Sequence, residues 1–142
     1  MVILGIDTSL SSSGFGVLAA EGSRLNALDM GTIKNAPKLS LSECLKNIYS
    51  AVAELIEKHR PNAIAVESVI YGKNAGTMLV LGEARGAVIA AAANAGIPIC
   101  EYEPRRMKMA VCGNGMADAA DALGLAITHA HSNSVLNAQN PI

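Results

Sequence analysis

The chain has 142 residues, of which 51% are hydrophobic and only 3% aromatic, and its formal net charge is −1. This length fits one domain with one core, and the hydrophobic content excludes a disordered chain. A net charge near zero by itself indicates neither a nucleic-acid partner nor a membrane surface.

The first third of the chain predicts an antiparallel meander. MVILGID at residues 1–7 is typical of a buried strand that ends in an acid, and GFGVLAA at residues 14–20 is typical of its hairpin partner. The polar TSLSSS between them predicts the turn. RLNALDMGTIK at residues 24–34 gives a third strand, for which we expect Leu25, Ala27 and Met30 to face inward.

Helices and strands then alternate. Ser40 and Glu43 form a predicted capping box at the start of an amphipathic helix. NAIAVESV at residues 62–69 and IPICEY at residues 97–102 are typical of buried strands, and a helix over about 75–95 separates them. Antiparallel strands followed by alternating helices and strands indicate an α/β fold, a mixed five-stranded sheet with helices on both faces.

The rest of the chain completes the expected domain. A short basic helix begins at Pro104, and NGMADAADALGLAITHAH at residues 114–131 predicts the last helix. We therefore assign residues 1–131 to one domain and residues 132–142 to a polar C-terminal tail.

The helix over residues 75–95 carries small residues on one face. Gly82 and Gly86 are four residues apart, and Ala90 follows one turn later. Two interpretations stay open: the face packs tightly within the chain, or it forms a subunit interface.

Four acids stand out against this map. Asp7 and Glu67 each end a predicted strand, and Asp118 and Asp121 lie three residues apart on the last helix. Sites assemble at the carboxyl ends of adjacent parallel strands, and one helix face can bring two more carboxylates there. Taken singly, Asp7 can be a turn former, and Asp118 and Asp121 can be a cap and a favourable first-turn charge.

Such a cluster needs a cation. Carboxylates a few ångströms apart raise each other's pKa, and a divalent ion removes that conflict. Oxygen ligands favour Mg²⁺ or Mn²⁺, and two ions roughly 4 Å apart can clamp an in-line phosphodiester displacement. When these four acids are left out, the chain has eight Asp and Glu against eleven Lys and Arg, a net charge of +3. This excess of positive charge predicts a basic rim that faces DNA.

Five blocks in chain order carry a resemblance to a known family. They are ILGIDTSLSSSGFGV, IAVESVIYGKN, LGEARGAV, EYEPRRMKMAVCGNG and DAADALGLAITHAH. Together they resemble a RuvC-type Holliday-junction resolvase of the ribonuclease-H-like superfamily. The match covers nearly the whole chain, although GID alone also opens sugar kinases and chaperone ATPases.

The resemblance implies a function and a site. It implies a homodimer that cuts four-way DNA junctions symmetrically with Mg²⁺, for which Mn²⁺ substitutes, and that works with a branch-migration motor complex. Asp7, Glu67, Asp118 and Asp121 match the family's metal-binding catalytic acids, and Lys108 matches a lysine near the scissile phosphate. The residues expected to contact DNA are Tyr71, Lys73, Asn74, Arg85, Arg105 and Arg106.

The chain also departs from the family pattern. The family carries a further basic helix between the GNG turn and the DAADAL helix, but here only Met116 and Ala117 intervene. A helix of about 12 residues spans roughly 18 Å, and the five residues 113–117 reach about 17 Å when extended. The last helix can therefore still reach the site, with little slack. Tyr71 stands near the place of a family aromatic that wedges into the junction, and Thr8 stands where proline is common.

Three alternatives to a nuclease stay open. The first is a degenerate member that binds junctions without cutting them, because the basic helix is missing. The second is an actin-like ATP-binding protein, although no second phosphate loop follows and 142 residues are too few for two lobes. The third is a small structural module without chemistry.

The location is expected to be cytoplasmic. The first residues lack the basic segment of a signal peptide, and Glu83 and Arg85 interrupt the longest apolar stretch, so we expect no membrane partner. The cysteines at positions 44, 100 and 112 are odd in number and lie in apolar patterns, which indicates reduced, buried thiols.

Overall fold

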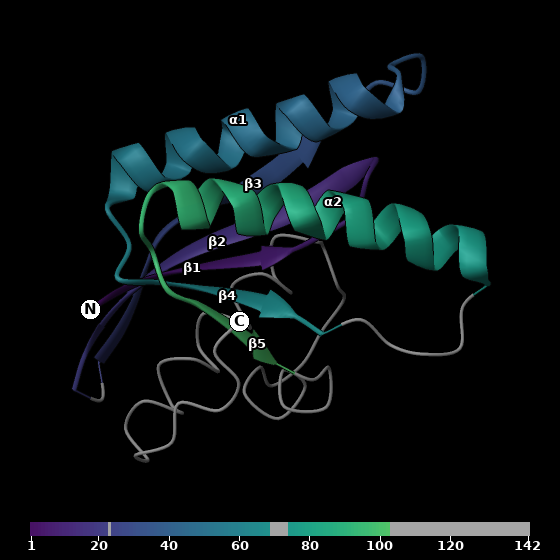
Figure 1. The fold of residues 1–142 in the computed structure, drawn as a ribbon. Coiled ribbons are helices and arrows are strands. Elements are labelled where there is room, and N and C mark those ends of the chain that lie inside the picture. Colours follow the sequence, from purple (N-terminus) through teal and green to yellow (C-terminus); the bar gives the residue numbers. More distant parts are fainter. Residues whose placement is uncertain (23, 69–73, 103–142) are drawn as a thin grey trace, which may run out of the picture.

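The computed structural model describes residues 1–22, 24–68 and 74–102, which form five strands and two helices (Figure 1). In chain order these are β1 (Val2–Asp7), β2 (Ser12–Glu21), β3 (Arg24–Lys34), α1 (Leu41–His59), β4 (Ala63–Glu67), α2 (Ala75–Asn94) and β5 (Ile99–Tyr102). All seven match elements expected from the sequence. The basic helix, the last helix and the tail expected beyond residue 102 lie outside the described residues.

The sheet is mixed, as predicted. Its strand order is β3-β2-β1-β4-β5, in which β1, β2 and β3 pair antiparallel. β4 pairs parallel to β1 and to β5, because α1 and α2 provide the crossovers that parallel strands require. β1 therefore lies at the centre and contributes to both halves.

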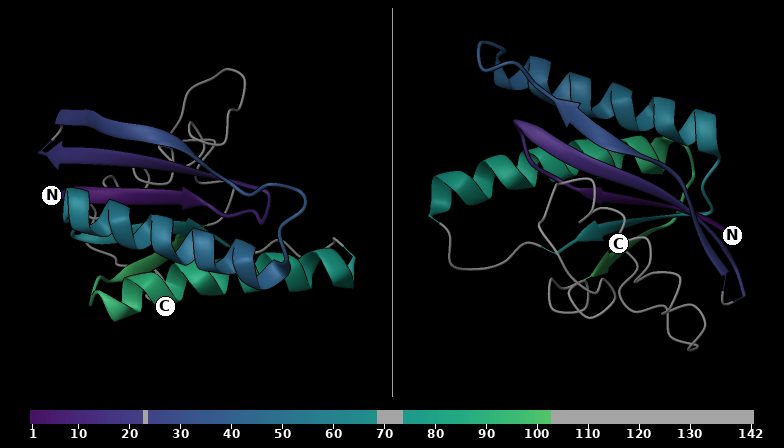
Figure 2. Two further views of the ribbon diagram at one scale, coloured as in Figure 1. Left: turned by 90° about the horizontal axis from the view of Figure 1, so that it is seen from above. Right: turned by 180° about the vertical axis from the view of Figure 1, so that it is seen from behind.

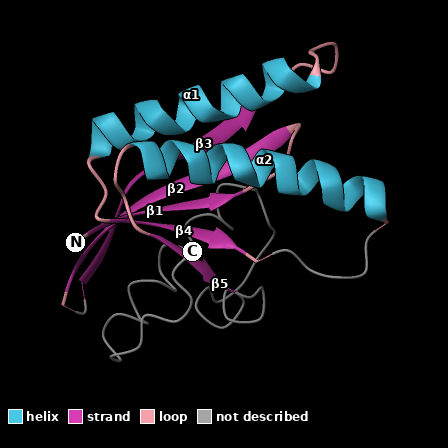
Figure 3. Cartoon of the chain, in the orientation of Figure 1, coloured by secondary structure: helices cyan, strands magenta, loops and turns pink. Residues whose placement is uncertain are grey.

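Both described helices cover the same face of this sheet (Figures 1 and 2). Figure 3 shows them as a second layer beside the strands. The larger core cluster joins α1 and α2 to strand residues such as Leu4, Ile6, Ile64 and Val66, all fully buried. A second cluster takes the alternate positions, which face the other way: Ile3, Leu18, Ala65, Cys100 and Tyr102. Helices on that second face stay a prediction for the residues beyond 102.

The predicted capping box of α1 is confirmed. The Glu43 backbone N–H donates to Ser40 Oγ at 3.3 Å, and the Ser40 N–H donates to Glu43 Oε2 at 2.8 Å. The bond from the Ser40 N–H, with a second one from Ser40 Oγ to Glu43 Oε2 at 2.8 Å, holds the pKa of the Glu43 carboxyl below its usual value, since both favour the ionised form. The helix ends at Arg60, whose φ of 49° is left-handed, and Pro61 follows.

The inward positions expected on β3 are wrong. Leu25 and Met30 are 37% and 49% exposed, whereas Ile33 is buried. β3 is an edge strand, and a register shift opposite Val17 and Leu18 alters its alternation. As a result Ala27 lies opposite Leu18, on the side away from the helices.

β3 is instead tied to α1 through Asp29. Its Oδ2 lies 2.9 Å from His59 Nε2 and 3.4 Å from Lys58 Nζ. The hydrogen bond with His59 is the main cause that lowers the pKa of Asp29 from its usual value of 3.8. This contact joins the end of α1 to the sheet edge.

We expect Asp29→Asn to lower the free energy of unfolding at pH 7 by about 0.5–1 kcal/mol, as for a partly exposed ion pair. Because folding lowers this pKa, the contribution is fully present above pH 3.8 and disappears as the pH falls through the folded-state value. Urea unfolding of both proteins at pH 7 and pH 3 measures this. An equal difference at both pH values would contradict it.

α2 is unusually apolar and little buried. By length and composition α2 is a candidate membrane span: its mean hydropathy is 1.3, and 22% of its most apolar stretch is buried in the fold. The charges of Glu83 and Arg85 therefore do not exclude a membrane-spanning helix by composition. In this fold it packs on α1 and the sheet through Ala84, Val88, Ala91 and Ala92. The core helix of a soluble protein can have the same length and composition, and the absence of a membrane partner stays an expectation.

The small-residue face of α2 points away from the described protein. A Cβ built at Gly82 or Gly86 meets no heavy atom within 4 Å in the part of the chain described, and Leu79 is 64% exposed. Of the two interpretations of this face, tight packing within the chain is therefore wrong for the described residues.

Candidate active site

Asp7 and Glu67 end two adjacent parallel strands at the same edge of the sheet. β1 and β4 are paired up to Ile6 opposite Val66, and each acid is the next residue of its strand. The parallel register aligns Ile6 with Val66, so the backbones of Asp7 and Glu67 lie at the same height along the two strands. The sequence predicted this juxtaposition from strand ends alone.

The two carboxylates also share a face. Side chains alternate along a strand, so Asp7 lies on the side of Ile3, and Glu67 on the side of Ala65. This is the face opposite α1 and α2. Both acids are partly buried, and both take part in polar interactions.

This pair fits a divalent cation. Two carboxylates on neighbouring strands supply hard oxygen ligands, which Mg²⁺ and Mn²⁺ prefer. Within the described ranges no group of three or more His, Cys, Asp or Glu side chains forms a metal site. The described strands therefore supply half of the four-acid set expected from the sequence.

The other predicted site residues fall outside the described part of the chain. These are Tyr71, Lys73, Arg105, Arg106, Lys108, Asp118 and Asp121. Their roles stay predictions.

Asn74 and Arg85 are described, and each already has a structural contact. Asn74 is the N-cap of α2, and its Oδ1 accepts from the Thr77 N–H at 2.9 Å. Arg85 Nη2 lies 3.0 Å from Glu101 Oε1, and its side chain is only 19% exposed. This ion pair joins α2 to β5 on the helix-covered face, away from Asp7 and Glu67. DNA contact stays a prediction for both, and for Arg85 it would compete with this pair.

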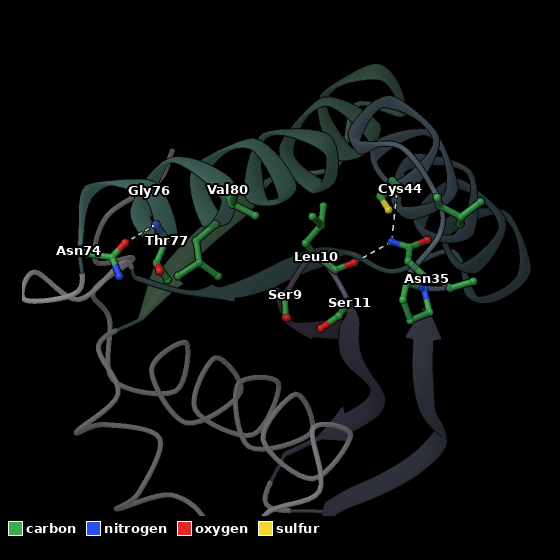
Figure 4. Close-up of a pocket in the computed structure, with 13 residues that line it drawn as sticks. Ser9, Leu10, Ser11, Asn35, Cys44, Asn74, Gly76, Thr77 and Val80 are labelled. Atoms are coloured by element: carbon green, nitrogen blue, oxygen red, sulfur yellow. Dashed lines mark hydrogen bonds between the residues drawn. The ribbon is translucent and has the colours of Figure 1, made fainter.

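Sequence reasoning missed two polar residues near Asp7. Ser13 lies in the predicted turn and Asn35 follows the third predicted strand, yet they are only 0% and 8% exposed. Both hold the turn that follows Asp7, beside a pocket of about 660 Å³ between this turn and the start of α2 (Figure 4). Their burial depends on tertiary packing, and no local pattern signals it.

Comparison with known families decides the assignment. A family model described as "Crossover junction endodeoxyribonuclease RuvC" matches residues 3–119, most of the chain. The chain belongs to the RuvC family. This family is one of metal-dependent nucleases, which agrees with the acids at the strand ends.

Individual relatives agree. The RuvC of Citrifermentans bemidjiense is 39% identical, with 93% of each chain covered. The RuvC of Vibrio atlanticus is 42% identical, covering 95% of this chain and 90% of the other. Among solved structures, "T. thermophilus RuvC in complex with Holliday junction substrate" aligns with a TM-score of 0.91 at 30% identity over the full length of both chains. The yeast mitochondrial resolvase Ydc2, at 13% identity and a TM-score of 0.64, shares the fold.

The alignment lengths show that this RuvC chain lacks residues its relatives have. The C. bemidjiense alignment spans 153 positions, whereas 93% of 142 residues is about 132, so about 21 positions face gaps in this chain. This number is compatible with the missing helix inferred from the sequence.

Proposed function

We propose that this protein is a metal-dependent endonuclease that resolves four-way DNA junctions by paired symmetric nicks in recombination and repair. The observation that carries the proposal is the pairing of Asp7 and Glu67 on one face at the ends of β1 and β4, in a chain of the RuvC family. The relatives from C. bemidjiense and V. atlanticus are both named as endodeoxyribonucleases, which favours cleavage over binding alone.

In this proposal the carboxylates of the chain position the metal ions. Asp7 and Glu67, with Asp118 and Asp121 from the predicted last helix, would hold two Mg²⁺ ions, for which Mn²⁺ would substitute. Bound there, the ions would supply an activated water molecule and stabilise charge on the scissile phosphate. Lys108 would donate to a phosphate oxygen, and the basic rim of Lys73, Arg85, Arg105 and Arg106 would bind the DNA backbone. Tyr71 contacts the junction bases.

The direct test uses a synthetic four-way junction with a different strand labelled in each of four reactions. We expect Mg²⁺-dependent nicks at symmetric positions in one pair of opposite strands, and little cleavage of a linear duplex of the same sequence. Binding without cleavage, at saturating protein in Mg²⁺ and in Mn²⁺, would favour the binding-only member of the family.

We further propose a homodimer that uses the exposed small-residue face of α2. Two symmetric nicks need two sites, and a two-fold axis is the simplest way to present them. Gly82 and Gly86 allow a close approach of another backbone, and nothing within the described chain fills the space beside them. A cytoplasmic location and cooperation with a branch-migration motor are proposed from the sequence and the resemblance.

We expect Gly86→Glu to convert the dimer into a folded monomer, because the charge meets open space in the single chain but lies buried between two copies. Sedimentation at micromolar concentration measures this, with Ser50→Glu on the exposed side of α1 as the matched charge control. Wild-type protein that sediments only as a monomer would contradict the proposed dimer.

A further inference from the structure

The four residues 8–11 form the turn that follows Asp7, and this turn lies where the active-site strand leaves the sheet. Asp7 is paired with Gly14 of β2, while the described pairing of β1 with β4 ends one residue earlier, at Ile6. The position of Asp7 therefore depends on β2 and on the chain that follows it. Two buried polar side chains hold this turn in place.

Ser13 holds the turn from β2. Its Oγ accepts from the Ser9 N–H at 3.0 Å and donates to the Ser9 carbonyl oxygen. Ser13 is fully buried, so water does not compete for these bonds. One hydroxyl thus satisfies both backbone groups of the residue two positions after Asp7.

Asn35 holds the turn from the other side, at the end of β3 (Figure 4). Its Nδ2 donates to the Leu10 carbonyl at 2.7 Å and to the Cys44 carbonyl at 3.3 Å, so one amide group links the turn to the first part of α1. Its backbone N–H donates to the Ser11 carbonyl at 2.9 Å, and its Oδ1 accepts from Asn47 Nδ2 at 3.1 Å. Both hydrogens of its amide and its carbonyl oxygen are therefore used.

We propose that Asn35, together with Ser13, is a positioning residue for Asp7, because it fixes the turn through which the end of β1 is held in place. The inference rests on the proposed function, since it concerns how that site binds its metal ions. Asn35 touches neither metal nor DNA in this role. Asn35 acts on the Asp7 carboxylate through the backbone of the turn at residues 8–11. Its loss therefore weakens metal binding and catalysis more than it weakens DNA binding.

The test compares Asn35→Ala with Asn62→Ala. Asn62 Oδ1 accepts from the Val2 N–H at 2.7 Å, so this asparagine also anchors β1, but at the opposite end of the strand. Three quantities are measured well below the melting temperature of each variant. They are the Mn²⁺ dissociation constant without DNA by electron paramagnetic resonance, the single-turnover cleavage rate at saturating junction, and the junction dissociation constant in EDTA.

We expect Asn35→Ala to weaken Mn²⁺ binding and to slow cleavage by about tenfold each, in the range found when support of a metal ligand is lost. The junction dissociation constant in EDTA stays within about twofold of the wild-type value, and Asn62→Ala changes none of the three. Asn47→Ala, which leaves the bonds of Asn35 to the turn in place, has a smaller effect than Asn35→Ala. Should Asn35→Ala not fold, Ser13→Ala tests the same turn and is expected to show the same pattern.

Wild-type Mn²⁺ binding and cleavage in Asn35→Ala, or equal losses in Asn62→Ala, would overturn this inference and leave the proposed function intact. Wild-type protein that neither binds Mn²⁺ nor cuts the junction would overturn both. The two failures are therefore distinguishable in one set of measurements.

Discussion

Asp7→Asn and Glu67→Gln are each expected to lower junction cleavage by at least about a hundredfold and to leave the fold intact. Each change replaces a carboxylate ligand with an amide of almost the same size, so it removes charge from the metal site while the strand packing stays the same. Asp121→Asn is expected to behave alike. The measurement is single-turnover cleavage of a labelled four-way junction in Mg²⁺ and in Mn²⁺.

Matched controls separate loss of the site from loss of charge in general. Asp29→Asn changes a strand aspartate on the helix-covered side, and Glu21→Gln changes an exposed glutamate at the end of β2. Both variant proteins are expected to cleave the junction at the wild-type rate. In EDTA the melting temperatures of Asp7→Asn and Glu67→Gln should equal or exceed that of the wild type, since each substitution relieves repulsion among the acids. Cleavage by Asp7→Asn at the wild-type rate would show that the active-site assignment is wrong.

Weak, strongly salt-dependent DNA binding is the second large effect we expect. Ionic bonds to phosphates supply much of the affinity for DNA, and removing one of them lowers the slope of log affinity against log salt by about 0.9. The sequence lacks the basic segment that the family carries before the predicted last helix, but it keeps the four acids and Lys108. Cleavage should therefore occur at low salt, with an affinity that disappears by physiological salt.

A salt titration of junction binding and of cleavage at saturating DNA distinguishes this from a misplaced last helix. Raising the DNA concentration and lowering the salt restores cleavage when only binding is weak. If the short linker at residues 113–117 held Asp118 and Asp121 about 1 Å away from the metal ions, the rate would fall roughly a hundredfold and saturation would not restore it. No cleavage at saturating DNA in low salt, with either metal ion, would favour the binding-only alternative.

The sequence by itself determined the order and type of the described elements. Short apolar runs and the Ser40–Glu43 capping box are local signals, and each acts within a few residues of chain. The same local signals placed Asp7 and Glu67 at strand ends. That the two acids lie at one edge of the sheet followed from one general rule, that parallel neighbours end at the same edge.

Only the tertiary structure decided what depends on contacts between distant residues. The prediction that Leu25 and Met30 face inward was wrong, because a register shift and an edge position are properties of strand pairing, which composition does not encode. The ion pair of Arg85 with Glu101 on β5, 16 residues later in the chain, is also a contact that no local pattern signals, and DNA contact by Arg85 stays a prediction. Asn35 and Ser13 carry no local signal of burial, because the groups they satisfy belong to a turn that packing brings against them. Hydrogen bonds to such a turn form only once the sheet and α1 are assembled, so the support of the active-site strand could be recognised only in the folded protein.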